Sequence, residues 1–233
     1  MAKTLAFAIL LPLLWTLSGC KSPGRDLERN EGLFPPLGYK VQHRQNRSIW
    51  IAPIQDRRAP PKRVDKGMFP VTYTMDGSWK RPVPEMLDGL LRREIKNSGI
   101  FGRLARSEEE ADWVLDVDLL AFYGAVEERI VGRAVKSNAI LHVRVFGPKG
   151  SKGERPLLRE REYRAPLETG ASLVLSRDPF AMAAQSFRLS LAMLLADLDK
   201  GGRLVDGVRE KTRLPGSSKE TPWRAVPAAA GKE

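Results

Sequence analysis

Alternating and continuous apolar runs predict the strands of this chain. The clearest run is 113–119, where Trp113, Leu115, Val117 and Leu119 fall on one face because successive strand residues point to opposite sides. A Gly-Pro-Lys-Gly turn separates the last two runs and indicates a hairpin. In chain order the predicted strands cover 48–54, 71–74, 101–104, 113–119, 139–146 and 157–163.

Two stretches carry apolar residues at the spacing of an amphipathic helix. The first begins at Pro84 and ends before Gly99, and the second runs from Asp178-Pro179 to about Asp199. Proline in the first turn and glycine just past the end are favoured at these helix positions. We expect the two helices to pack on the sheet through Leu87, Leu91, Phe187 and Leu194.

The order of these elements predicts an α+β fold, a single two-layer sandwich in which two amphipathic helices pack on one face of a mixed sheet. We place this domain at residues 48–200. If strands 48–54 and 113–119 are parallel, the first helix connects them as a right-handed crossover. Residues 20–47 are expected to form a flexible tether, because they carry Pro, Gly and charge without periodicity. The basic tail, 201–233, is expected to be disordered.

The first twenty residues have the pattern of a secretory signal. Lys3 is followed by an apolar run at 5–14, which is shorter than the roughly 20 residues that a membrane span needs. The segment ends Leu17-Ser18-Gly19-Cys20. This ending resembles the lipobox of bacterial lipoproteins, which implies that residues 1–19 are a signal peptide and that Cys20 is acylated. The alternative is a signal peptide with an incidental cysteine.

Acylation of Cys20 would hold the chain on a bilayer, because several buried acyl chains anchor a protein stably where one does not. Lys21-Ser22 follows the cysteine, without an aspartate. By resemblance to enterobacterial sorting, this implies a location in the cell envelope, on the periplasmic face of the outer membrane.

Charge and cysteine content narrow the possible partners. The chain has 39 Lys and Arg against 28 Asp and Glu, a formal net charge of +11. Nucleic acid fits poorly because a lipobox directs the chain out of the cytoplasm, so anionic lipid or an acidic partner is expected, with a merely solvated basic surface as the alternative. The single cysteine excludes an intramolecular disulfide.

No motif in the sequence predicts catalysis. Asp116 and Asp118 fall on the face of their strand opposite the apolar residues, and we interpret them as solvated acids rather than an acid/base pair or metal ligands. His43 and His142 have no second histidine at zinc-ligand spacing. Neither a Gly-x-Ser-x-Gly elbow nor a Walker loop occurs. We therefore expect a protein that is not an enzyme and has no catalytic residue, metal or cofactor.

Three short motifs lie within residues 71–122. They are a Trp-x-x-Pro before the first helix, a Ser-Gly-x-Phe after it and an Ala-Asp-aromatic-x-Leu strand, at Trp79 to Pro82, Ser98 to Phe101 and Ala111 to Leu115. In these motifs residues 71–122 resemble the ABC-type transport auxiliary lipoproteins, the outer-membrane partners of transporters built around lipid-binding MCE proteins. The long Pro/Arg loop at 55–70 and the basic tail depart from the family pattern.

The resemblance implies a lipid-anchored periplasmic adaptor that assists an inner-membrane lipid transporter. The same layout resembles the N-terminal domain of the Tol-Pal translocation protein and the lipoproteins that activate peptidoglycan synthases. The alternative function is therefore an envelope-assembly scaffold. Candidate partner-binding residues are Trp79, Arg81, Arg57 and Arg58, although Trp79 could instead belong to the core.

Overall fold

The computed structural model describes five stretches of the chain. They are residues 25–59, 79–128, 132–151, 153–170 and 178–200. The signal peptide, Cys20, the predicted strand 71–74 and the tail 201–233 lie outside the described residues.

The described residues form one mixed sheet of seven strands, with the central order β3-β1-β4-β5-β6. β1 lies parallel to both β3 and β4, and β4, β5 and β6 are antiparallel neighbours. The short strands β2 and β7 pair with β4 and β5 respectively. The strands are β1 (Gln45–Ile51), β2 (Gln55–Asp56), β3 (Phe101–Leu104), β4 (Trp113–Glu128), β5 (Arg133–Phe146), β6 (Leu157–Arg164) and β7 (Leu167–Glu168).

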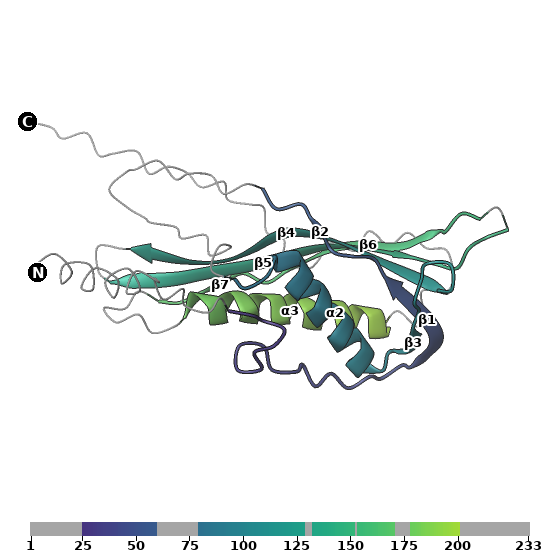
Figure 1. Cartoon of the computed structure of the whole chain (residues 1–233), viewed down its shortest axis with the longest axis horizontal. Coiled ribbons are helices and arrows are strands. Elements are labelled where there is room, and N and C mark those ends of the chain that lie inside the picture. The colour runs from purple at the N-terminus through teal and green to yellow at the C-terminus, as the bar shows by residue number, and fades with distance from the viewer. Residues whose placement is uncertain (1–24, 60–78, 129–131, 152, 171–177, 201–233) are drawn as a thin grey trace, which may run out of the picture.

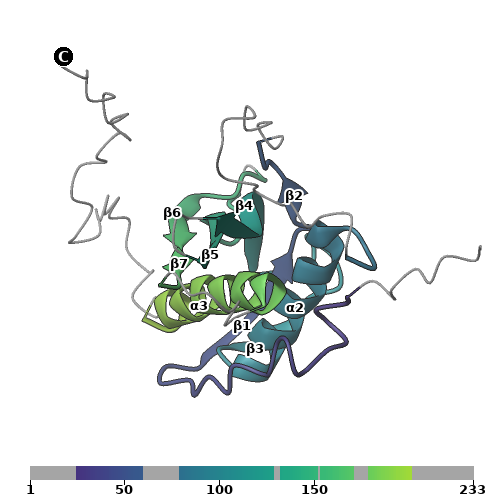
Figure 2. The same cartoon turned by 90° about the vertical axis from the view of Figure 1, so that its left-hand side faces the viewer.

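Two helices cover one face of this sheet, α2 (Val83–Ser98) and α3 (Pro179–Lys200) (Figure 1). Viewed from the end, α3 lies beneath β4, β5 and β6, and α2 lies beside it (Figure 2). α2 ends at Gly99, whose φ of 67° is left-handed, a conformation that glycine adopts without a steric penalty. The predicted α+β fold, with two helices on one face of a mixed sheet, is confirmed.

The core lies between the sheet and the helices. The four helix residues expected to contact the sheet, Leu87, Leu91, Phe187 and Leu194, are all fully buried. The inward-facing residues of β4 are also buried, as their alternation predicts. Burial of this many large apolar side chains is the dominant favourable contribution to folding.

β4 and β5 are much longer than predicted and pair from one end to the other. The register shifts between Leu119 and Ala121, which face Leu141 and Ile140. Because one extra residue in a strand reverses which residues point inward, Phe122 rather than Tyr123 faces the core. The simple alternation therefore ends at Leu119 and does not predict the second half of β4.

The expected tether at 20–47 is wrong for the residues that the structure describes. β1 already begins at Gln45, and residues 25–44, which we call the strap, run along the helices (Figure 1). Leu27 and Phe34 of the strap are fully buried and belong to the main core cluster. The packed residues of the domain therefore extend back at least to Arg25, well before residue 48.

Candidate functional site

The strap is fixed at its first described residue, Arg25. The carbonyl oxygen of Arg25 accepts a hydrogen bond from the backbone N–H of Lys80 at 2.9 Å. Its guanidinium forms an ion pair with Asp178, at the start of α3, and lies 4.1 Å from the centre of the Phe180 ring. These contacts hold the beginning of the domain against the N-terminal end of α3.

The middle of the strap packs on both helices. The Phe34 ring lies 5.8 Å from that of Phe187 on α3, centre to centre. Glu94 of α2 accepts a hydrogen bond from the Leu37 N–H at 3.0 Å. Arg188 of α3 donates to the Pro36 carbonyl at 3.2 Å. Apolar packing and hydrogen bonds thus act together along this segment.

The end of the strap is held by the buried carboxylate of Asp199, in the last turn of α3. Its oxygens accept hydrogen bonds from the N–H groups of Gln42 and His43, both at 2.8 Å, and from the Tyr39 hydroxyl at 2.9 Å. Burial alone would raise the pKa of Asp199, but these donors outweigh it and hold the pKa below its usual value of 3.8. Burial beside this carboxylate raises the pKa of Tyr39 to about 12.

The side of α3 that faces away from the sheet is apolar and partly exposed. Leu189 and Met193 lie four residues apart, on one face of the helix, and are 42% and 40% exposed. We call the row to which they belong the outer stripe. Its uncharged members are Ala181, Gln185, Leu189, Ala192, Met193 and Ala196. Two partly exposed charged residues border it, Arg188 on one side and Asp197, which pairs with Arg159 and Arg161 of β6, on the other.

The composition of α3 also passes a simple test for a membrane-crossing helix. Its mean hydropathy over the most apolar window is 1.2, but half of that window is buried in the protein. Since Phe187, Leu191 and Leu194 pack against the sheet and α2, α3 is a core helix of the domain. The solvent side of α3 also carries large apolar residues, Leu189 and Met193.

The sheet face opposite the helices carries a charge cluster. Arg144 of β5 donates to Asp116 at 2.7 Å and to Asp118 at 3.1 Å, both on β4. The ring nitrogens of His142 lie 3.4 Å from Asp118 and 3.1 Å from Glu160 of β6. The two aspartates lie on the face predicted for them, but Asp118 is 7% exposed and is shielded from solvent by its neighbours.

This cluster joins a histidine to two carboxylates, an arrangement also found in acid/base sites. The residues directly opposite His142 are Asp118 on β4 and Glu162 on β6, so the register brings no Ser, Thr or Cys nucleophile opposite it. No group of three or more His, Cys, Asp or Glu suited to a metal occurs in the part of the chain that the structure describes. In this arrangement the positive charge of Arg144 and the negative charges of Asp116 and Asp118 compensate one another.

Trp79, a candidate for partner binding, lies in the core and is 8% exposed. Its ring packs edge-on against Phe180 at 4.8 Å and lies 5.8 Å from Phe122. The indole fills the space where the start of α3 meets β4. The surface hypothesis for Trp79 is therefore wrong, and the alternative that it belongs to the core is confirmed.

The three candidate arginines lie in two different settings. Arg81 binds Asp26 at 3.0 Å and Glu28 at 2.6 Å, so it ties the strap to the residues before α2 and holds the pKa of Asp26 below its usual range. Arg58 pairs with Asp56 beside β2 at 2.8 Å.

Arg57 is the most exposed of the three. Its side chain is 66% exposed and its Nε lies 3.8 Å from Asp118. Arg57 and Arg58 follow β2 on the sheet, whereas Arg81 contacts the strap. The structure therefore does not gather the four candidates into one surface.

Sequence reasoning missed the strap and the outer stripe. Apolar residues occur in the strap at irregular intervals, at Leu27, Leu33, Phe34, Leu37 and Tyr39, and their presence in a supposed tether was the available signal. For α3, the signal was the scarcity of charge outside the buried face. Arg188 is the single charged residue between Pro179 and Ala196.

Comparisons with known proteins identify no family. No family model matches the sequence, and no curated protein is significantly similar to it. Several solved structures resemble the fold of the domain. A Xanthomonas campestris protein of family DUF330 is 15% identical, with 72% of this chain and 94% of that protein covered and a TM-score of 0.41.

Two further structures are similar at the same low level. A hypothetical protein from Chlamydia trachomatis is 12% identical, over 66% of this chain and 98% of that protein, with a TM-score of 0.43. A minor lipoprotein from Acinetobacter baumannii is 9% identical, over 68% of this chain and 91% of that protein, with a TM-score of 0.33. At these identities and scores the similarities establish no function for this chain.

Proposed function

We propose that this chain is a lipid-anchored, non-enzymatic protein of the bacterial envelope. It is held at the periplasmic face of the outer membrane by acylated Cys20, and it assists an inner-membrane ABC/MCE-type lipid transport system as an adaptor. The observation that carries the proposal is the lipobox, which ends five residues before Arg25, a residue that is already bound to the folded domain.

Two further features support an adaptor. The charge cluster of the outer sheet face is compensated internally, and the strand register supplies no nucleophile beside His142. The domain instead offers extended surfaces, an open sheet face and an apolar helix side, which are the features that protein and lipid partners use. The transport role rests on the resemblance of residues 71–122 to the auxiliary lipoproteins.

Labelling of cells with a radioactive fatty acid tests the anchor. The full chain should incorporate label, and Cys20→Ser should lose it and remain unprocessed, because position 20 holds the single thiol of the sequence. A Ser22→Ala variant is the matched control, since it changes a neighbouring hydroxyl and leaves the thiol in place. Undiminished label in Cys20→Ser would refute the anchor.

Cross-linking of the tagged full chain in intact cells tests the partner. We expect an MCE protein or a lipid-transporter permease among the cross-linked proteins, and we expect Cys20→Ser to reduce their capture because the domain is then no longer held at the membrane. Capture of a penicillin-binding protein or a Tol-Pal component, with no transporter subunit, would refute the transport role and favour the envelope-assembly scaffold.

A further inference from the structure

The contacts of Arg25 limit the distance between the proposed membrane anchor and the folded domain. Cys20 and Arg25 are five residues apart, and each residue spans at most about 3.3–3.6 Å, so their Cα atoms lie within about 18 Å of each other. Arg25 itself is fixed to the start of α3 through Asp178 and Phe180. While Arg25 makes these contacts, the N-terminal end of α3 therefore lies close to the bilayer that holds the acyl chains.

The outer stripe extends from this same end of the helix. A helix rises 1.5 Å per residue, so Leu189 lies about 16 Å and Met193 about 22 Å along the axis from Asp178. These distances are similar to the reach of the chain between Cys20 and Arg25. A helix lying along the membrane surface would place both exposed side chains at the lipid boundary.

We propose that the outer stripe of α3 lies on the surface of the bilayer that holds Cys20, with Leu189 and Met193 inserted at the boundary between headgroups and acyl chains. This inference rests on the proposed lipid anchor. It adds an orientation for the domain and assigns a binding surface, of which the ligand is the phospholipid bilayer itself.

The short connection explains why a small apolar stripe is sufficient. Two side chains about 40% exposed would bind a membrane weakly from solution, because affinity scales with buried apolar area. The anchor makes this contact intramolecular, and a short linker gives an effective concentration in the millimolar range. Weak lipid affinity is then enough to keep α3 on the surface.

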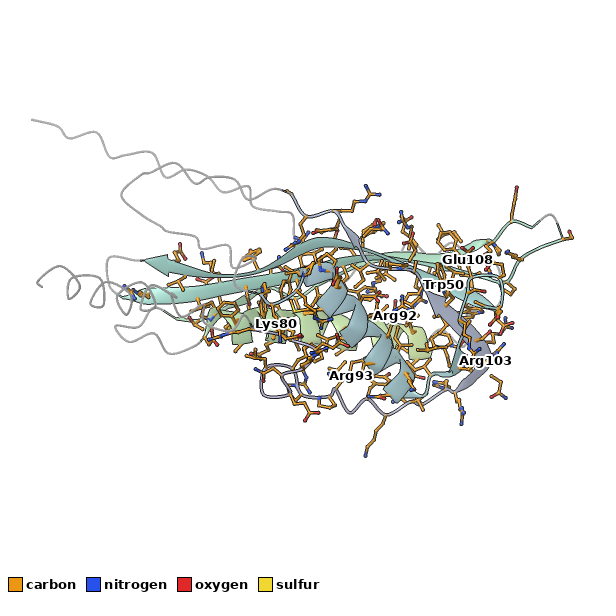
Figure 3. All side chains as sticks on the ribbon, viewed as in Figure 1. Trp50, Lys80, Arg92, Arg93, Arg103 and Glu108 are labelled. Atoms are coloured by element: carbon orange, nitrogen blue, oxygen red, sulfur yellow. The ribbon has the colours of Figure 1, made fainter. Side chains whose placement is uncertain are left out.

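The charges near the anchor are compatible with this orientation. Lys80, whose backbone N–H donates to Arg25, is exposed and is labelled in Figure 3. Arg29 is also exposed and lies 3.9 Å from Asp26. Cations at this position would meet the phosphate groups of lipids, which favours binding to an anionic surface. The acid that borders the outer stripe, Asp197, is 14% exposed and pairs with Arg159 and Arg161 of β6, so its charge is compensated within the protein.

A fluorescent probe on the lipidated full chain tests the orientation. Because Cys20 is acylated and is the sole cysteine, Met193→Cys supplies one free thiol for an environment-sensitive dye. Leu157→Cys is the matched control, since Leu157 is also a large apolar residue, 49% exposed, but lies on β6. Both proteins are reconstituted in vesicles of phosphatidylethanolamine and phosphatidylglycerol, with and without a nitroxide-labelled lipid.

We expect the nitroxide lipid to quench the probe at position 193 and not the probe at position 157. Adding Leu189→Glu should reduce quenching at 193, while thermal unfolding and flotation with the vesicles stay unchanged because Leu189 is exposed. If both proteins float and neither probe is quenched, the docking is refuted and the anchor stands. If the protein does not float, the anchor itself is refuted, and the docking with it.

A second copy of the chain is the other possible occupant of the stripe. In that case the emission at position 193 would already be shifted to the blue in detergent and would depend on protein concentration, without a change on addition of vesicles. That outcome would also refute docking on the bilayer.

Discussion

Substitution of Phe34 distinguishes a packed strap from a flexible tether. Phe34 is fully buried, its ring lies 5.8 Å from that of Phe187, and the Arg93 guanidinium lies 5.6 Å from its centre. Truncation of a buried phenylalanine to alanine costs about 3–5 kcal/mol, from lost apolar burial and the cavity left behind. On a flexible tether the same change would cost nearly nothing.

The expected loss is large relative to the stability of a domain of this size. Domains unfold with a free energy of about 5–15 kcal/mol, and for 150–250 residues each kcal/mol lowers the melting temperature by about 2–4 °C. Phe34→Ala should therefore lower the melting temperature by roughly 6–20 °C. Circular dichroism recorded during thermal unfolding of the full chain measures this shift.

A matched control and a double mutant make this experiment specific. Leu157→Ala removes an apolar side chain that is 49% exposed, and should change stability by no more than about 0.5 kcal/mol. Because Phe34 and Phe187 are in contact, the double alanine variant should lose less than the sum of the single losses, by about 0.5–3 kcal/mol. If Phe34→Ala melts like Leu157→Ala, the packing of the strap is refuted.

Two further predictions concern buried side chains. Trp79→Ala should destabilise the domain by about 3–5 kcal/mol in urea unfolding, because it empties the space between Phe122 and Phe180; a wild-type midpoint would contradict the core position of Trp79. The pKa of Asp199 is lower in the folded than in the unfolded chain, so its contribution to stability is present above the unfolded value near 3.8 and is lost as pH falls through the lower folded value. Asp199→Asn should therefore lower the stability of the domain at pH 7 and make that stability fall less steeply in acid. Urea unfolding midpoints measured from about pH 5 downward test this. A variant whose stability falls in acid as steeply as that of the wild type would contradict the prediction.

The fold could be predicted because its signals are local. α2 has proline in its first turn, glycine at its end and an apolar face between them, so helix spacing alone identified it. The first half of β4 alternates strictly, but the extra residue between Leu119 and Ala121 interrupts that pattern. Pairing with β5, rather than local alternation, is what carries β4 on to Glu128.

The strap could not be predicted because its contacts are distant in sequence. Gln42 and Asp199 are 157 residues apart, and Arg25 and Asp178 are 153 residues apart. The strap adopts neither helical nor strand periodicity, so a search for periodic patterns assigns it to a linker. Trp79 was misplaced for a related reason, since a tryptophan between a turn and prolines gives no local sign that Phe122 and Phe180 enclose it.

The strap also determines how the domain would respond to a mechanical load. A pull transmitted through Cys20 would reach Arg25 first and would peel the strap from α3 one contact at a time, towards Asp199. β1 would resist more strongly, because it lies between two parallel strands and would have to slide past both together. Release of residues 25–44 would add about 70 Å of extended chain while the sheet stayed folded. Under tension the strap would therefore unfold and let a membrane-bound domain extend into the periplasm. When the tension ends, the strap could pack on the helices again.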